Sequence, residues 1–543
     1  MRLNLKLIFL IIVFSLLGMK ALLHPGLYTS HDISHQMIRI YYYFQAVNEG
    51  RFLPDWISQL ANGYGYPLFF FSYHIPWIAG IPLLKVGFDI PNTIKILFFL
   101  SFLFSGIFMF FFVKSLLKNS LAAFLSSIIY MWNPYHFLII LVGASMGIAF
   151  IFVFLPLIFL GINLTRENKN WGVVILALGI LGIVLSHTMH AVFLSPIILM
   201  FALWSFFNTG SKINFLRKLF FGLLLGLLIS SFYLIPAINY NDAISVHKVE
   251  AVSKLYERNF VDFKQLIYSR WGYSAISNNA KDGELSFQVG IIQWISILGL
   301  SLLIVFRRLA KINQKLGVYL LIGFTISIFL MLDITKPIWD FLEKFIFLDF
   351  PFRLILPCMF IASIFTAIIL VSFKKNVQII ILFTFLFIAL YTNRNHLNVV
   401  EYKSILIPDS FLSDITSNGA DEYLPVNADR KLLYKPNHYI EGEALSASNI
   451  KYTTNSIAFD LKAEKDASAS VSQFYFPGQK LYVDGKIKDF NIDKQGRINF
   501  YALEGKHSIL VKYEGTPLTS FSKYLSIIGI IVLLIIIKQL AFD

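Results

Sequence analysis

Apolar runs of about twenty residues recur along most of this chain, separated by short polar or charged stretches. Such a run can cross the hydrocarbon core of a bilayer as a helix, so the pattern predicts a polytopic membrane protein. No small-residue cleavage site follows the first run, Leu3–Leu17, which we therefore interpret as an uncleaved helix rather than a signal peptide. The predicted membrane helices lie near residues 5–22, 94–113, 121–138, 143–162, 171–187, 190–207, 218–237, 285–306, 316–333, 351–373, 376–392 and 518–538.

The segment PLFFFSYHIPWIAGIPLLKVG (67–87) does not fit this series. It is apolar, but it contains His74, Trp77, Lys85 and three prolines. If it crossed the membrane, every later loop would change sides. We interpret it as a re-entrant or interfacial segment on the outer side, with an additional crossing as the alternative.

The stretch 393–517, before the last apolar run, is long enough to be a separate domain. From Lys451 onwards it alternates as strands do, in SIAFDLKA, VSQFYFPGQKLYVDG, RINFYAL and HSILVKYEG, with turn signals at Asp484-Gly485 and Glu504-Gly505. The predicted fold class is a mainly α-helical polytopic membrane protein, with about 12–14 transmembrane helices and a small mainly β domain near the C-terminus. The predicted parts are a transmembrane domain (1–392) with outer loops 23–67 and 238–284, the β domain (393–517) and a C-terminal transmembrane helix (518–543).

Composition and charge agree with a membrane protein. The chain is 57% hydrophobic and only 14% charged, whereas a soluble domain is nearer a quarter charged. A net charge of +14 would suggest nucleic acid as a partner of a soluble protein, but here the cations collect in short gaps between apolar runs, as in cytoplasmic loops. We therefore expect the lipid bilayer, and no nucleic acid, as a partner. The basic gaps contain Lys114 and Lys118; Arg166 and Lys169; Lys212, Arg217 and Lys218; Arg307, Arg308, Lys311 and Lys315; Lys374 and Lys375; and Lys538.

These gaps predict an orientation. Arg2 and Lys6 precede the first helix, so the N-terminus is expected in the cytoplasm and the regions 23–67, 238–284 and 393–517 are expected outside. The sole cysteine, Cys358, excludes an intrachain disulfide and argues against a cysteine-based zinc site.

Ionisable residues gather directly after the first predicted helix, in SHDISHQMIRI (30–40). Asp32, His35 and Arg39 recur at helical spacing, and Ser30 is a candidate N-cap. The opposite face is apolar, so we expect an amphipathic helix lying parallel to the outer surface with a carboxylate at the membrane boundary. A merely solvated face of an interfacial helix is the alternative interpretation.

Three features favour a functional site. The carboxylate is close to the first helix, its companions include His31 and His35 rather than lysines, and a stretch rich in glycine and aromatic residues, NGYGYPLFFFSYH (62–74), suits a close-fitting pocket. Asp55, Tyr64 and His74 are expected to line the same cleft.

Several longer motifs extend the pattern: HD (31–32), GYGYPLFFFSYHIPW (63–77), NPYHF (133–137), LSHTMHA (185–191), FQVG (287–290), FPFRLILP (350–357), EYLP (422–425), FYFPGQKLYVDG (474–485) and LEGKHSILVKYE (503–514). Together they resemble the GT-C superfamily of integral membrane glycosyltransferases, whose first outer loop carries a functional aspartate soon after the first helix. The chain is most similar to bacterial membrane proteins of the family named for a 6-pyruvoyl-tetrahydropterin synthase-related membrane domain and to the YfhO-like glycosyltransferases. The motifs span nearly the whole chain in the expected order.

The resemblance implies a polyprenyl-phosphate-linked sugar as donor, on the outer side of the bacterial cytoplasmic membrane, and a cell-surface glycan, lipid or protein as acceptor. Asp32 would be the catalytic base, with His31, His35 and Arg39 contacting the sugar or phosphate. One departure stands out: relatives often carry an Arg-Gly pair and an acidic residue after NPYHF, whereas LVGASMGIAF (141–150) is uncharged here. This chain would then bind its donor differently or be less active.

Further candidates lie later in the chain. Arg353 opens a predicted helix on its outer side, where its guanidinium can grip a phosphate with two hydrogen bonds or snorkel to lipid headgroups. His187 and His190, three residues apart at an outer helix end, suit substrate contact, packing or metal binding. No metal ligand and no cofactor is firmly predicted, and a divalent cation stays open.

Three functions follow from these observations. The first is a GT-C glycosyltransferase that inverts the donor configuration. The second is a transporter or flippase for a lipid-linked glycan, which would place ionisable residues near the membrane midplane and broken helices in paired halves. The third is a non-catalytic cell-envelope assembly protein.

Overall fold

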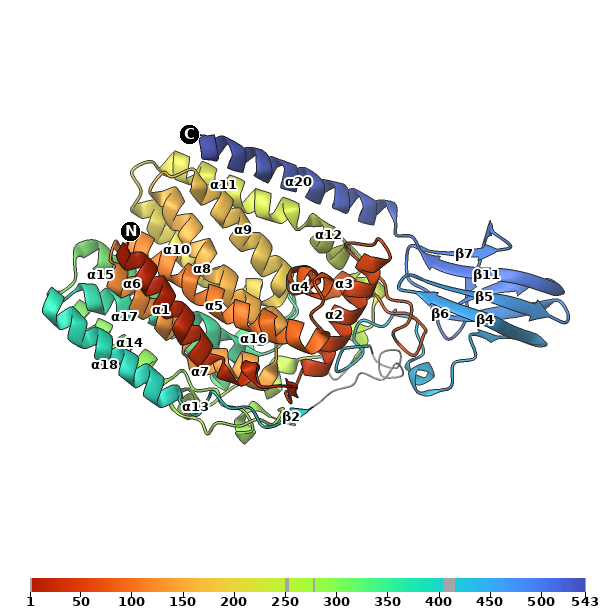
Figure 1. Ribbon diagram of the computed structural model, residues 1–543, viewed down its shortest axis with the longest axis horizontal. Coiled ribbons are helices and arrows are strands. Elements are labelled where there is room, and N and C mark those ends of the chain that lie inside the picture. Colours follow the sequence, from red (N-terminus) through yellow and green to blue (C-terminus); the bar gives the residue numbers. More distant parts are fainter. Residues whose placement is uncertain (1, 250–252, 277–278, 404–415, 543) are drawn as a thin grey trace.

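A computed structural model describes residues 2–249, 253–276, 279–403 and 416–542. Figure 1 shows a bundle of helices with a group of β strands projecting from one end, and both marked termini lie at the opposite end of the bundle. The longer helices of the bundle are α1 (Arg2–Gly18), α5 (Ile90–Leu117), α6 (Ser120–Met131), α8 (Met146–Arg166), α9 (Trp171–Ser186), α10 (Thr188–Phe207), α11 (Lys212–Ile229), α14 (Ile291–Val305), α15 (Lys311–Leu330), α17 (Ile355–Val371), α18 (Lys375–Asn393) and α20 (Pro517–Phe542). The remaining helices are α2 (Ile33–Asn48), α3 (Leu68–Phe71), α4 (Ile75–Lys85), α7 (Pro134–Phe137), α12 (Ser231–Asn239), α13 (Phe263–Ile267) and α16 (Lys336–Leu342), with a π-helical turn η2 (Leu138–Gly143) and a 3₁₀ turn η8 (Pro351–Leu354).

The helices confirm the predicted fold class. By length and composition, seven helices among the described residues can cross a membrane, or nine if each of two bent pairs forms one span. Three shorter apolar helices, α1, α9 and α14, occupy the remaining ranges in which a crossing is predicted. The chain is therefore a multi-pass membrane protein.

Two predicted helices are broken. In the range 121–138, α6 meets the segment Pro134–Gly143, formed by α7 and η2, at 46°. The break arises because Pro134 cannot continue α6 and Asn133 accepts a hydrogen bond from the His136 amide to start α7. In the range 218–237, α11 and α12 meet at 71°. The Phe232 amide freed at this break donates to Ser526 Oγ of α20 at 2.8 Å, so a neighbouring helix stabilises the bend.

The segment 67–87 forms α3 and α4. At about 1.5 Å per residue, the 11 residues of α4 extend about 16 Å, roughly half of the hydrocarbon core. The helix packs against α2 and α5. Its length favours the re-entrant interpretation over an additional crossing.

The basic gaps that start α6, α9 and α11 lie together at the end of the bundle that holds the N-terminus. Ser120 Oγ donates to Asn4 Oδ1 at 2.9 Å, Lys118 forms a 2.6 Å ion pair with Glu167, and Lys218 Nζ donates to the Asn168 carbonyl at 2.6 Å. The outer loops and the β strands lie at the other end (Figure 1). The two ends therefore separate as the charge pattern predicts; which end faces outward stays a prediction.

The β strands near the C-terminus form a sandwich of two antiparallel sheets. Its sheets have the strand orders β3-β6-β10-β9 and β4-β5-β11-β7-β8. Apolar residues from both sheets, including Val471, Phe500, Phe459 and Val511, form one buried cluster between them. The strands are β3 (Ile440–Glu441), β4 (Leu445–Thr453), β5 (Ser456–Ala463), β6 (Ala467–Phe474), β7 (Gln479–Val483), β8 (Lys486–Lys488), β9 (Asn491–Ile492), β10 (Arg497–Ala502) and β11 (Gly505–Tyr513). A separate pair, β1 (Leu27–Tyr28) and β2 (Tyr402–Lys403), joins the first loop to the chain after α18.

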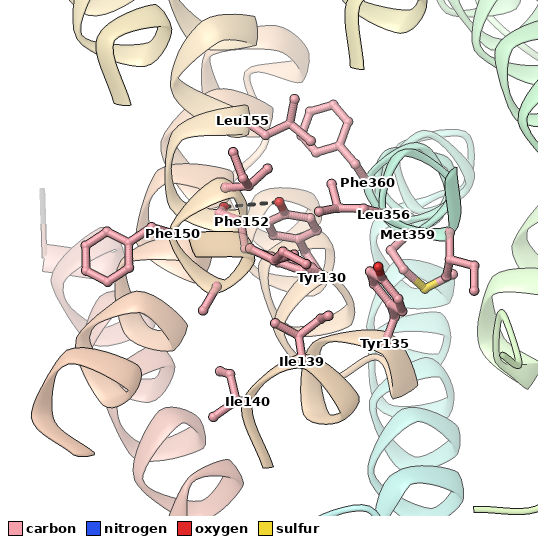
Figure 2. Packing of buried hydrophobic residues seen from close by; sticks show 14 of the residues in the cluster. Tyr130, Tyr135, Ile139, Ile140, Phe150, Phe152, Leu155, Leu356, Met359 and Phe360 are labelled. Atoms are coloured by element: carbon pink, nitrogen blue, oxygen red, sulfur yellow. Dashed lines mark hydrogen bonds between the residues drawn. The ribbon is translucent and has the colours of Figure 1, made fainter. Parts of the chain in front are cut away.

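The bundle core between α6, α8 and α17 is packed with aromatic and aliphatic side chains. Figure 2 shows Tyr130 of α6 and Phe152 of α8 facing α17, with the Tyr130 hydroxyl donating to the Phe152 carbonyl at 3.1 Å. Tyr135 of α7 lies beside Met359 of α17 in the same view. This packing joins α6, α7, α8 and α17, whose flanking segments include Ser145 before α8 and Arg353 before α17.

Orientation can be measured by cysteine labelling. Ser446 is exposed on β4, and the native Cys358 is fully buried in α17, so the wild-type chain is the unlabelled control. We expect Ser446→Cys to react with an impermeant maleimide in intact spheroplasts. Labelling only after lysis would contradict the predicted orientation.

Candidate functional site

Asp32 sits where the loop before α8 meets the start of α2. Its backbone amide donates to the Gly143 carbonyl at 3.0 Å, and Ser145 Oγ donates to its Oδ2 at 3.2 Å. The carboxylate is half-buried. Asp32 is therefore held by the uncharged stretch 141–150. This is the stretch in which the sequence differs from the motif of the proteins that it resembles.

The start of α2 differs from the sequence prediction. Ser30 is not the N-cap: Asp32 holds that position, and α2 begins at Ile33. The Asp32 carboxylate makes no capping hydrogen bond and is instead oriented by Ser145. The predicted N-cap was wrong because a tertiary contact, rather than local capping preference, fixes the helix start. A carboxylate not used for capping keeps lone pairs available for chemistry.

The predicted polar face of α2 is bonded to other parts of the chain. Gln36 donates to the Ala144 carbonyl at 2.9 Å and accepts from the Tyr73 hydroxyl at 2.7 Å. Arg39 donates to the Ser417 carbonyl at 2.7 Å, and its guanidinium lies 5.5 Å from the centroid of the Tyr73 ring. Arg39 thus ties α2 to the chain that leads into the β sandwich, and its predicted phosphate contact would have to share these bonds.

The two histidines of the first loop have different surroundings. His31 Nε2 lies 2.8 Å from the Tyr273 carbonyl, so it acts as a donor and its ring is fixed. His35 Nδ1 is buried without a partner among the described residues. Burial and the nearby Arg39 guanidinium lower the pKa of His35, while the Asp32 carboxylate opposes them. His35 is therefore neutral at pH 7 and close to both charged groups.

A second polar cluster, formed by His187, His190, Asp349 and Arg353, lies inside the bundle. Arg353 Nη1 is 2.9 Å from His187 Nε2 and 3.1 Å from His190 Nδ1, and Nη2 forms a 2.5 Å ion pair with Asp349. Arg353 is only 8% exposed, which argues against snorkelling to lipid headgroups. The predicted pair of hydrogen bonds from Arg353 to a phosphate would have to compete with existing bonds, because both terminal nitrogens are already bonded within the cluster.

The cluster nevertheless leaves hydrogen-bond donors free. A guanidinium only donates, so His190 Nδ1 must accept and its ring proton must lie on Nε2. Both His190 Nε2 and Arg353 Nε are buried without a partner among the described residues. The Tyr135 hydroxyl also has no partner within the described part of the chain, and it lies within electrostatic range of Arg353 and Asp349. Unpaired buried donors are costly, and a bound anion would satisfy them.

Tyr73 and Gly147 connect the two groups of residues. A Cβ on Gly147 would lie 2.5 Å from the Ser186 carbonyl and 3.0 Å from the Tyr73 ring, so α8 approaches the end of α9 as closely as glycine allows. His187 follows directly, and burial, followed by the charges of Arg353 and Arg39, lowers its pKa well below the ordinary value. The structure therefore gathers Asp32, His35, Arg39, His187, His190 and Arg353 at one end of the bundle.

Four predicted site residues are not part of this group. The His31 ring is bonded to the Tyr273 carbonyl, and the side chains of Asp55, Tyr64 and His74 are bonded or packed within other contacts. Asp55 is buried in a 2.6 Å ion pair with Lys523 of α20. Tyr64 stacks on Phe474 of β6, with ring centroids 4.9 Å apart. The β sandwich therefore packs against the glycine-rich stretch around Tyr64 and occupies the space in which a pocket was predicted.

His74 is packed rather than available. Its Nε2 lies 2.8 Å from the Phe69 carbonyl and its Nδ1 lies 3.2 Å from the Tyr43 hydroxyl. Burial lowers the pKa of His74 to about 4, so the ring is neutral at pH 7. Its predicted contact with substrate is not supported by these bonds.

Sequence reasoning missed Ser145, Tyr73 and Asp349. Asp349 stands four residues before Arg353, directly ahead of the FPFR motif, and this spacing was a readable signal. Ser145 and Tyr73 had no such signal, because both act through long-range contacts. Among the described residues, no group of three His, Cys, Asp or Glu side chains could hold a metal ion.

Comparison with known proteins does not assign the chain to a family. No family model matches the chain, and no curated protein matches it. A solved structure, the cryo-EM structure of arabinofuranosyltransferase AftD from Mycobacteria, is similar at a TM-score of 0.47 and 11% identity, over 75% of this chain and 28% of that chain. The chain thus spans little more than a quarter of that protein, and a likeness at this level carries no functional conclusion.

The Asp349–Arg353 pair predicts a clear stability effect. Asp349→Ala leaves a buried guanidinium without its countercharge, which typically costs about 3–5 kcal/mol. We expect a marked fall in the thermal unfolding midpoint in detergent, partly restored by adding Arg353→Met. Asp333→Ala, which breaks the exposed ion pair with Lys281, should cost at most about 1 kcal/mol. Equal effects at the two sites would contradict the assigned burial.

Proposed function

We propose that this chain is a membrane glycosyltransferase that moves a sugar from a polyprenyl-phosphate donor to a cell-surface acceptor on the extracytoplasmic side of the bacterial cytoplasmic membrane. The observation that carries the proposal is the pairing, at one end of the bundle, of a half-buried carboxylate with buried N–H donors that lack a partner. The family resemblance of the motifs agrees with it.

The two halves of the site suit the two halves of the reaction. The Asp32 carboxylate takes the proton of the acceptor hydroxyl as the hydroxyl oxygen attacks the anomeric carbon. The bond from that carbon to the phosphate oxygen breaks, and the polyprenyl phosphate leaves with an additional negative charge. Direct displacement inverts the configuration at the anomeric carbon.

The histidine–arginine cluster is suited to the leaving phosphate. Arg353 Nε and His190 Nε2 are fixed by the bonds that their other nitrogens make, so they need no reorganisation to donate to an anionic oxygen. Arg353 also carries a positive charge in a buried setting, where electrostatic stabilisation is stronger than in water. Asp349 offsets part of that charge and fixes the guanidinium.

The described residues support the transporter less strongly. The α6–α7 bend places Tyr135 within electrostatic range of Arg353 and Asp349, whereas the described residues at the α11–α12 bend are bonded to α20. The two broken helices therefore do not form the matched pair that a transporter would use. A non-catalytic role would leave the unpaired donors of the cluster unexplained. Measured transfer decides between these functions.

The first test of the activity is Asp32→Asn. This change keeps the size and the contact with Ser145 but removes the negative charge, and general bases typically contribute about 10²–10⁴ in rate. We expect transfer from a defined polyprenyl-phosphate sugar in proteoliposomes to fall by that order, at equal protein and equal unfolding midpoint. Asp242→Asn, an exposed carboxylate in the second outer loop, is the matched control and should transfer normally. Near-normal transfer by Asp32→Asn would remove this residue as the base.

The second test is Arg353→Lys. Lysine keeps the charge but lacks the Nε–H group and the planar geometry, so turnover should fall at least about tenfold if the guanidinium holds the leaving phosphate. Arg394→Lys, an exposed arginine just after α18, is the control. Unchanged turnover of folded Arg353→Lys would leave the arginine a purely structural role.

A further inference from the structure

A cavity lies between α9, α11 and α20 at the end of the bundle opposite the candidate site. Its volume is about 750 Å³, within the usual range for small-molecule sites. The three helices that form it lie side by side in Figure 1, with α20 on the outside. The residues that line it play no part in the proposed transfer reaction.

The cavity has a polar end and an apolar end. Asn168, Asn214, Arg217 and Lys218 line it at the level of the basic gaps. Further along α11, Leu224 and Leu228 line it, about 10–16 Å from Arg217 at 1.5 Å per residue. On α20, Gln539 and Leu540 lie nearer the chain end, and Val532 and Ile536 lie deeper in the bundle. The lining therefore changes from basic to apolar along the helix axes.

Among the described residues, no carboxylate neutralises the charge at the polar end. Lys118 and Lys169, at the same end of the bundle, are both paired with Glu167, at 2.6 and 2.8 Å. Arg217 and Lys218 form no ion pair among the described residues, and no described carboxylate lines the cavity. Lys218 Nζ is held towards the cavity by the carbonyl and side-chain oxygens of Asn168, at 2.6 and 2.7 Å.

We propose that this cavity binds a membrane glycerophospholipid with an anionic headgroup. Charge complementarity selects the headgroup: a guanidinium, an ammonium and amide groups surround the position of a phosphodiester, and basic pockets between membrane helices bind such headgroups. The acyl chains of the lipid cover the apolar walls of the cavity. A free phosphate has no apolar part and would leave these walls uncovered. The bound lipid bridges α20 to α9 and α11.

The bridging position matters for the fold. Only 17% of the most apolar stretch of α20 is buried within the bundle, so this helix makes few protein contacts for its length. Near its other end, Lys523 pairs with Asp55 of the first outer loop. A lipid that fills the gap beside Ile536 and Leu540 stabilises the attachment of α20 to the bundle.

Native mass spectrometry of the detergent-purified full chain tests the proposal. Titration with phosphatidylglycerol should give one tightly held lipid, with phosphatidylcholine held much more weakly. Arg217→Gln/Lys218→Gln should weaken phosphatidylglycerol binding about 30-fold, since each basic side chain near a lipid surface contributes about a factor of five. Arg307→Gln/Arg308→Gln, two exposed arginines of another basic gap, is the control and should bind normally.

A second variant separates lipid binding from folding. Leu228→Trp fills the apolar end and keeps both charges, so it should abolish tight phosphatidylglycerol binding and the rise in unfolding midpoint that the lipid causes in the wild type. Equal retention of phosphatidylcholine and phosphatidylglycerol, or equal losses in the control pair, would show annular lipid only and overturn the proposal. Selective binding of undecaprenyl phosphate without phosphatidylglycerol would overturn it as well.

Discussion

Placing a charge or an unpaired polar group in the hydrocarbon core of a membrane costs several kcal/mol, and this constraint sorts the whole molecule. Cations in the gaps before α6, α9 and α11 gather at the end that carries the N-terminus. In contrast, α2, which follows Asp32 and contains Arg39, lies at the end that carries the β sandwich. Between these levels the helices pack with apolar and aromatic side chains, as around Tyr130 and Phe152. Most charged side chains therefore lie towards the two ends of the bundle.

Arg353 is the informative exception, because it is buried and charged. Its burial is tolerable only because Asp349 supplies a countercharge and two neutral imidazoles accept its N–H groups. The arrangement still leaves buried donors unpaired, an expensive feature that packing alone does not explain. In the proposed reaction these donors face the charge that develops on the leaving phosphate. This role would explain why the fold keeps buried donors without a partner.

The β sandwich is joined to the site rather than merely attached to the chain. Glu49, just after α2, accepts hydrogen bonds from the backbone and hydroxyl of Thr454, and Gln473 of β6 donates to the Gly63 carbonyl. Arg39 is held by Ser417 on the way to the sandwich. The helix that carries Asp32 is thus fixed at both ends, by the 142–145 loop and by the sandwich. Such fixation suits the positioning of the base proposed at Asp32.

The sequence by itself determined the class of fold. Apolar runs, basic gaps and two-residue alternation predicted the helical bundle and the strands, because helix length and strand periodicity are local consequences of burying apolar side chains. It also pointed to Asp32, His35, Arg39, His187, His190 and Arg353, since ionisable residues beside membrane helices stand out. Only the tertiary structure decided how these residues are used. The bond from Ser145 to Asp32 and the packing of the sandwich on the glycine-rich stretch depend on contacts between segments far apart in the chain. The pairing of Asp349 with Arg353 depends on the local path of a turn. Periodicity encodes neither.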